Sequence, residues 1–167
     1  MGRIGKEVAR RARGFDMRIL YHNRSRALKS EETLAVEYSA FENLLREAHF
    51  VSLNVPLTEE TEGLIAEPEL RLMREDSVLI NAARGPVVDS AALHTALTEG
   101  WIAGAALDVT EPEPLPRDHP LLELTNLVLT PHTGSATLRS RLRMGEMARD
   151  NLVAGLEQRP LPNQVHK

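Results

Sequence analysis

Three places along the chain carry polar side chains that are able to do chemistry together. Arg84, the pair Asp108 and Glu113, and His132 each come shortly after a short apolar run of the kind that forms a buried strand. Taken singly, an arginine beside a Gly-Pro turn, a glutamate in a proline-rich loop or a histidine after a proline is more often an ordinary surface residue. Together, a fixed cation, a carboxylate and a histidine are what the reduction of a carbonyl beside a carboxylate requires.

Each of these groups has its own task in such a reduction. Hydride addition to the carbonyl carbon places negative charge on the oxygen, so a proton donor must lie within reach, and histidine, with a pKa of about 6.5, suits this role. A carboxylate bonded to the other ring nitrogen favours the imidazolium and fixes its orientation. An arginine guanidinium forks onto carboxylate and carbonyl oxygens and keeps its proton. Asp108 is a separate candidate, for holding the edge of a nicotinamide ring.

The elements that must position these groups alternate between strands and helices. We predict strands at residues 17–22, 50–55, 77–82, 102–109 and 126–130. We predict helices at residues 6–13, 41–48, 64–73, 90–99 and 136–156. Gly14 is expected to end the first helix, Pro68 to lie in the first turn of the third, and Asp89 and Gly100 to cap the fourth. Between these elements lie a charged stretch (23–37), a proline-rich loop (111–120) and an extended tail (159–167).

This alternation predicts an α/β fold with right-handed βαβ units and a doubly wound parallel sheet. Ligands of such sheets bind beyond the carboxyl ends of the strands, which is where the polar groups stand. The last helix carries an apolar stripe. Its members are Leu138, Leu142, Ala148, Leu152 and Leu156.

The first residues, Gly2-Arg3-Ile4-Gly5, run straight into a helix and form the back half of the dinucleotide fingerprint G-x-G-x-x-G. In that motif the phosphates sit at the helix N-terminus, where free amides and the positive end of the dipole favour anions. The strand and first glycine of the motif would precede Met1. We therefore expect the sheet to lack its central first strand, leaving an unpaired edge on each neighbour, and we hypothesise that Met1 is an internal start or truncation point.

The end of the second strand of the fingerprint bears on the choice of cofactor. NAD-selective folds place an Asp or Glu there, about 20 residues beyond the glycines, to bind the ribose 2′-hydroxyl. This chain has His22-Asn23-Arg24-Ser25-Arg26 instead, with no carboxylate, and Arg24 with Ser25 and Asn23 is suited to a 2′-phosphate. The sequence favours NADP, with NAD as the alternative.

Composition narrows the function classes. A net charge of −4 gives no basic surplus for nucleic acid, and no apolar run approaches the roughly 20 residues of a membrane span. Cysteine is absent, which favours a reducing compartment, and the start lacks a secretory signal, so we expect a cytoplasmic protein. No metal site is predicted, because the remaining histidines lack ligand spacing. These are His22, His49, His94, His119 and His166.

Five motifs stand in register along the whole chain. They are Gly2-Arg3-Ile4-Gly5, Pro56-Leu57-Thr58-x-x-Thr61, Ile80-Asn81-Ala82-Ala83-Arg84-Gly85, Leu107-Asp108-Val109-x-x-Pro112-Glu113-Pro114 and Pro131-His132-x-Gly134-Ser135-Ala136. In this order and spacing the chain resembles the D-isomer-specific 2-hydroxyacid dehydrogenases, a family with a Rossmann-type cofactor domain. The segments 107–116, 119–122 and 132–137 most resemble the glyoxylate/hydroxypyruvate reductases within it.

The resemblance implies roles for individual residues. Arg84 orients the substrate, His132 is the acid/base, and Glu113 is its partner, since the family places this glutamate immediately before the second proline, which excludes Glu111. Further residues are expected around the cofactor. They are Gly2, Arg3, Ile4, Gly5, Pro56, Thr61, Ala82, Ala83, Arg84, Asp108, His132 and Gly134.

The resemblance also implies an organisation and an activity. Residues 1–134 would form the NAD(P)-binding domain, and residues 135–167 a long helix and tail that return to a substrate domain absent from this chain, with a homodimer as the full-length assembly. The leading hypothesis is reduction of glyoxylate or hydroxypyruvate to a D-2-hydroxy acid by NAD(P)H. The alternatives are a different 2-oxo acid, a nucleotide-binding corepressor or scaffold, and a fragment with no activity.

Overall fold

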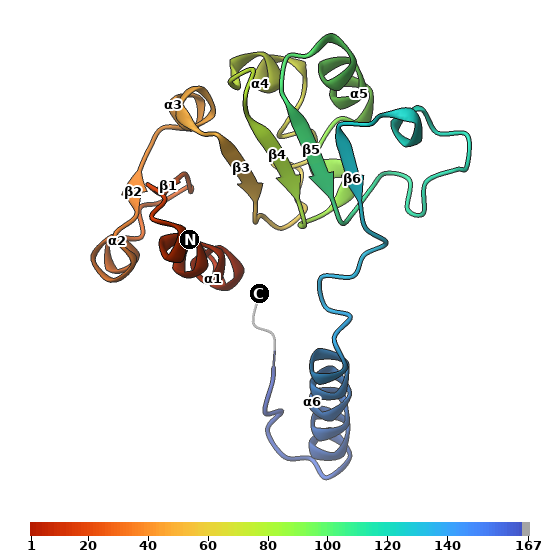
Figure 1. Cartoon of the computed structure of the whole chain (residues 1–167). Helices are drawn as coiled ribbons and strands as arrows, with labels where there is room; N and C mark the ends of the chain where they lie inside the picture. The colour runs from red at the N-terminus through yellow and green to blue at the C-terminus, as the bar shows by residue number, and fades with distance from the viewer. Residues whose placement is uncertain (165–167) are drawn as a thin grey trace. The chain divides into compact units, whose positions relative to one another are not determined.

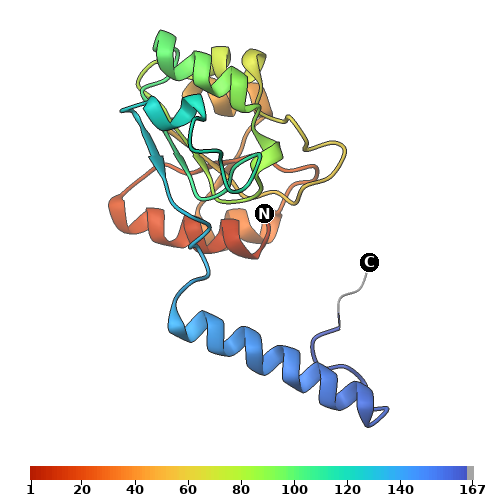
Figure 2. The same ribbon diagram turned by 90° about the vertical axis from the view of Figure 1, so that its right-hand side faces the viewer.

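The computed structural model describes residues 1–164, which divide between Pro131 and His132 into two compact units. The second unit contains α6 (Leu138–Leu156), one continuous helix in Figure 2. Within the described residues, no helix is both long and apolar enough to cross a membrane. The first unit contains α1 (Arg3–Ala12), η1 (Arg13–Phe15), β1 (Leu20–Tyr21), α2 (Leu28–Leu34), β2 (Glu37–Tyr38), α3 (Phe41–Glu47), β3 (Phe50–Leu53), α4 (Glu67–Leu72), β4 (Val78–Asn81), η2 (Gly85–Val87), α5 (Ser90–Glu99), β5 (Gly104–Leu107), η3 (Pro120–Glu123) and β6 (Leu127–Leu129).

The strands of the first unit form two parallel sheets. Four strands pair in the order β3-β4-β5-β6, and β1 pairs with β2 in a separate ribbon (Figure 1). Every pairing is parallel, in registers such as Val51 with Leu79 and Leu79 with Ala105. The predicted α/β fold with parallel strands is confirmed. β1 and β3 are each the edge strand of their sheet. This division into two sheets is expected of a doubly wound sheet that lacks its first strand.

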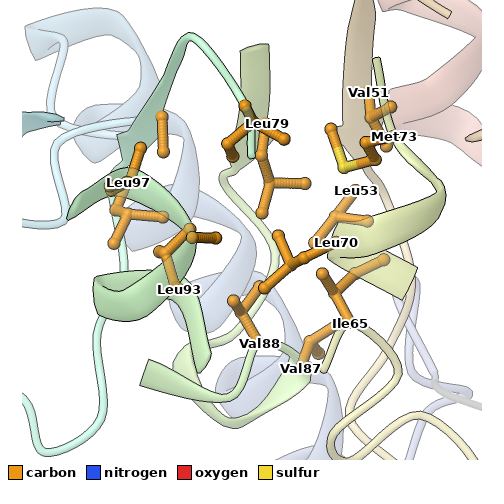
Figure 3. Packing of buried hydrophobic residues seen from close by; sticks show 14 of the residues in the cluster. Val51, Leu53, Ile65, Leu70, Met73, Leu79, Val87, Val88, Leu93 and Leu97 are labelled. Atoms are coloured by element: carbon orange, nitrogen blue, oxygen red, sulfur yellow. The ribbon is translucent and has the colours of Figure 1, made fainter. Parts of the chain in front are cut away.

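The main core lies between the four-stranded sheet and α4 and α5. Strands β3 and β4 alternate buried with less buried residues, as period-two geometry requires, so Val51 and Leu79 point to the same side. Figure 3 shows them packed with Leu70 of α4 and Leu93 of α5. Full burial of one such side chain contributes about 1.5–3 kcal/mol, so this cluster holds the carboxyl ends of the strands in place.

A second, smaller core joins α1, β1 and α2. Its buried members are Ala9, Tyr21, Leu34 and Val36. This cluster includes α2 and leads into β2, two elements that lie in the segment expected to be only a charged stretch. Helix α2 was not predicted because its sequence, LKSEETL, has no repeated apolar spacing.

Three predicted boundary residues are confirmed, and one is wrong. The carboxylate of Asp89 accepts from the amides of Ala91 and Ala92 at 2.9 and 3.0 Å, and Gly100 takes the left-handed conformation with φ 73°, so both predicted caps of α5 are correct. Pro68 lies in the first turn of α4 as expected. Gly14 does not end the first helix. That helix passes into η1, and the chain reverses at Asp16, whose φ is 54°.

The second unit also departs from the expected extended tail. The amide of Asn163 donates to the side-chain oxygen of Asn151 at 3.0 Å, which folds residues 159–164 back along α6. Residues 165–167 of the predicted tail, including His166, lie outside the described residues. The leucines of the predicted stripe are exposed, from 59% at Leu142 to 76% at Leu138, and the buried residue of the helix is Ala154.

Candidate active site

The turn that carries Arg84 is built by a buried amide. Asn81, the last residue of β4, is 1% exposed, and its Nδ2 donates to the carbonyl of Arg84 at 2.8 Å. Its Oδ1 accepts from the amide of Ala83 at 3.0 Å. The Arg84 guanidinium, on an exposed residue, donates to the Ala83 carbonyl at 2.6 Å. Asn81 therefore fixes the backbone that presents predicted site residues Ala82, Ala83 and Arg84.

Asn81 belongs to one of the five motifs, but the motif alone does not indicate its role. The available signal was a carboxamide at an inward position of an otherwise apolar strand, because a polar side chain buried there must find hydrogen-bond partners.

The Arg84 turn packs directly on the loop that follows β5. A β-carbon on Gly85 would overlap the carbonyl of Thr110 and lie 2.9 Å from the amide nitrogen of Glu111. Thr110 in turn organises this loop, since its hydroxyl donates to the Pro112 carbonyl at 2.9 Å and its amide donates to Glu113 Oε2 at 3.5 Å. The structure thus brings the turn of Arg84 against the loop that carries Glu113.

Asp108 lies at the same edge, directly after β5. Its amide donates to the Asn81 carbonyl at 2.9 Å, and its Oδ1 accepts from the Thr130 hydroxyl at 2.5 Å. This half-buried carboxylate therefore sits between the ends of β4 and β6. It occupies the rim where ligands of a parallel sheet bind.

The N-terminus of α1 has the features of a phosphate site. Gly2 is the N-cap, no side chain caps this end, and the first turn contains no acidic residue. A β-carbon on Gly5 would lie 3.7 Å from Cβ of Asn54, so this end of the helix approaches the residue that follows β3. Arg3 and Ile4, in the first turn, are exposed. Uncapped amides beside a basic residue fit a dinucleotide pyrophosphate.

The loop that follows β3 is closed on itself by Thr61. Its hydroxyl donates to the Pro56 carbonyl at 2.6 Å and accepts from the Thr58 amide at 2.8 Å. The Gly63 amide donates to the Pro86 carbonyl at 2.8 Å, which ties this loop to the one after β4. The predicted residues Pro56 and Thr61 therefore belong to a fixed loop, in which the threonine hydroxyl shapes the backbone.

The bend after β1 carries the predicted adenosine-side residues. The Asn23 carboxamide donates to the Ser25 carbonyl at 3.2 Å and spans the bend, with Arg24 exposed between them. The pKa of Glu60 is lowered by a hydrogen bond from Thr58 and, more weakly, by the charge of Arg24. The cation of this bend thus acts electrostatically on the loop that follows β3.

The remaining predicted residues belong to the second unit. His132 begins it with a φ of 52°, a left-handed conformation that histidine adopts more readily than most residues, and Gly134 follows. Arg84 and Glu113 belong to the first unit, whereas His132 belongs to the second. The pairing of His132 with Glu113 stays a prediction. Among residues 1–164, no group of three or more His, Asp or Glu side chains is arranged to hold a metal ion.

Comparison with known proteins identifies the family. Residues 1–134 match the NAD binding domain of the D-isomer specific 2-hydroxyacid dehydrogenases. The chain belongs to this family. Over its full length it is 54% identical to a glyoxylate reductase of Korarchaeum cryptofilum, and it covers 50% of that protein. It is 52% identical to a glyoxylate reductase of Aeropyrum pernix, again over 100% of the chain and 50% of the relative.

Solved structures of the family agree with the fold. A protein of Thermus thermophilus superposes with a TM-score of 0.93 at 49% identity, over 99% of this chain and 51% of that one. A D-lactate dehydrogenase of Lactobacillus jensenii, crystallised with NAD+, superposes with a TM-score of 0.91 at 30% identity, over 100% of this chain and 54% of that one. The chain spans about half the length of the relatives it matches.

Proposed function

We propose that this chain is the cofactor-binding part of a reductase that converts glyoxylate or hydroxypyruvate into the D-2-hydroxy acid with NAD(P)H. The observation that carries the proposal is the contact of Gly85 with Thr110, because it sets the turn of Arg84 against the loop of Glu113 at the edge where Asp108 follows β5. The glyoxylate reductases among its relatives support the substrate class.

The bound nicotinamide supplies the hydride in this reaction. The Arg84 guanidinium binds the substrate carboxylate and carbonyl oxygens and holds the carbonyl in one orientation. His132, as imidazolium, donates a proton to the carbonyl oxygen as negative charge develops there. Glu113 accepts a hydrogen bond from the other ring nitrogen, which keeps the ring oriented and favours its charged form. Asp108 holds the carboxamide edge of the nicotinamide.

The remaining site residues hold the dinucleotide. The amides at Gly2, Arg3, Ile4 and Gly5 bind the pyrophosphate at the N-terminus of α1. Asn23, Arg24 and Ser25 bind the adenosine ribose, and the arginine there favours NADPH over NADH. The other residues line the nicotinamide side. They are Pro56, Thr61, Ala82, Ala83 and Gly134.

The organisation of the parent protein is part of the proposal. Residues 1–134 form the cofactor domain, and residues 135–167 lead back to a substrate domain. The absence of cysteine favours a cytoplasmic location, and the long apolar stripe of α6 suits the buried environment of a larger protein or homodimer.

The test is turnover by a purified protein that carries this chain. Mixed with NADPH and glyoxylate, it should consume the reduced nicotinamide, followed by loss of its absorbance. Replacing His132→Ala should abolish turnover and leave NADPH binding intact. Binding without turnover in the unsubstituted protein would instead support a corepressor, a scaffold or an inactive fragment, and loss of both properties in the variant would indicate a structural role for His132.

A further inference from the structure

We infer that Glu31 is a cofactor-specificity residue, which holds the guanidinium of Arg26 so that Arg24 alone meets the 2′-phosphate of NADPH. The inference rests on the proposed function and names a residue outside the motifs of the site. Arg24 and Arg26 stand two positions apart in the bend after β1, so both are candidates for the same phosphate. Their surroundings differ, and that difference decides which one is available.

Arg26 is bound along one edge of its guanidinium. Its Nε donates to Glu31 Oε1 at 3.1 Å and its Nη2 donates to Oε2 at 2.6 Å, a two-point contact of fixed geometry. The same guanidinium lies 5.5 Å from the ring centroid of Tyr38 in β2. Its charge is therefore balanced by a carboxylate and its position is set by an aromatic ring.

The carboxylate that holds Arg26 is itself fixed from the core. Tyr21 is 4% exposed, and its hydroxyl donates to Glu31 Oε1 at 2.6 Å while it accepts from the Ala27 amide at 2.7 Å. The Arg26 contact and then the Tyr21 hydrogen bond hold the pKa of Glu31 below its ordinary value. Tyr21 thus connects the start of α2 to the carboxylate, and the carboxylate connects to Arg26.

Arg24 stands outside this arrangement. It lies within the bend that Asn23 spans, and its charge acts on Glu60 only weakly, as the last of the causes that lower the pKa of that carboxyl. An arginine whose charge is already neutralised contributes little to an incoming phosphate, whereas a weakly engaged one contributes a charge-assisted contact. Removing the charge of Glu31 should therefore release a second cation toward the 2′-phosphate.

The experiment measures equilibrium binding of 2′,5′-ADP and of 5′-AMP by calorimetry, because these nucleotides differ only in the 2′-phosphate. In Glu31→Gln the ratio of the two affinities should rise about three- to tenfold in favour of 2′,5′-ADP, as expected when a second guanidinium joins an exposed phosphate contact. Arg26→Gln alone should change the ratio less than about twofold. In the double variant Glu31→Gln with Arg26→Gln, the gain should disappear.

A matched control separates this effect from a general change in charge. Glu37, the first residue of β2, belongs to an exposed pair in which its Oε2 accepts from Arg18 Nη2 at 2.7 Å. Glu37→Gln removes one negative charge and should leave the ratio unchanged. Circular dichroism checks that each variant is folded. Tyr21→Phe removes the hydrogen bond that holds the Glu31 carboxylate without changing the charge, so it should also raise the ratio in favour of 2′,5′-ADP.

Two results contradict the inference alone. One is an unchanged ratio in folded Glu31→Gln and Tyr21→Phe when the unsubstituted protein binds both nucleotides, and the other is a gain that survives removal of Arg26. Failure of the unsubstituted protein to bind either nucleotide would instead contradict the proposed function.

Discussion

Gly85 and Thr110 are in backbone contact, so close that a β-carbon on Gly85 would overlap the Thr110 carbonyl. This contact joins the turn after β4 to the loop after β5. It requires glycine for lack of space, because the backbone of Gly85 is not in the left-handed region.

Substitution Gly85→Ala should therefore separate the two loops. We expect a loss of about 1–3 kcal/mol in the free energy of unfolding, the usual cost of forcing extra volume into a packed site. Denaturant unfolding measures this. Gly14→Ala is the control, because a β-carbon there meets nothing within 4 Å, and it should be nearly neutral. Equal stability of the two variants would contradict the proposed role of the contact.

Asn81→Ala should loosen the turn that presents Arg84. The substitution leaves the Ala83 amide and the Arg84 carbonyl without the partner that the buried carboxamide provides, at a cost of about 1–3 kcal/mol in the free energy of unfolding. Thermal unfolding would measure it, with Asn43→Ala, an exposed position on α3, as the control. Asn81→Asp keeps the acceptor for Ala83 but sets a buried carboxylate against the Arg84 carbonyl, so at neutral pH we expect a loss at least as large as that of Asn81→Ala.

Much of the fold was predictable because its signals are local. Apolar runs and breakers located strands β3 to β6, and Asp89 and Gly100 marked the ends of α5. The short elements α2 and β2 were not predictable, since their formation depends on packing in the small core around Tyr21 rather than on an apolar pattern in their own sequences.

The candidate site was also predictable only in part. Residue types and motif spacing indicated that Arg84, Asp108 and Glu113 follow strands. In the structure Arg84 lies in the turn after β4, Asp108 directly follows β5, and Glu113 lies in the loop beyond it. The hydrogen bonds of Asn81 and the contact of Tyr21 with Glu31 could not be predicted, because they depend on side-chain directions that a sequence does not specify. Glu31 follows Tyr21 by ten residues with no periodic relation, so only the packing of α2 on β1 brings them together.

Arg24→Gln should weaken the binding of NADPH more than that of NADH. If Arg24 contacts the 2′-phosphate, the loss for NADPH should be about tenfold or more, since a hydrogen bond to a charged group contributes roughly 1.5–3 kcal/mol. Fluorescence titration with both cofactors measures it. Lys29→Gln removes an exposed cation from α2 and should leave the preference unchanged. Equal losses for the two cofactors would contradict a role for Arg24 in recognising the 2′-phosphate.

The Glu31 carboxylate should also make stability depend on pH in a defined direction. Its pKa lies below the ordinary 4.5 because Arg26 and Tyr21 stabilise the charged form. A carboxyl with a depressed folded pKa contributes stability that is complete above its unfolded pKa and is lost as the pH falls through the folded value. The unfolding temperature of the unsubstituted protein should therefore exceed that of Glu31→Gln at neutral pH.

This difference should shrink as the pH falls below about 4.5, the ordinary pKa of the carboxyl. Glu42→Gln, from an exposed pair with Arg46 at 3.3 Å whose side chains are 49% and 67% exposed, should show a smaller difference at neutral pH. A difference between the unsubstituted protein and Glu31→Gln that stays constant through the acid range would mean that the carboxylate is not stabilised by Arg26. In that case Arg26 would already be available to a phosphate, and both arginines of the bend would determine the preference for NADPH.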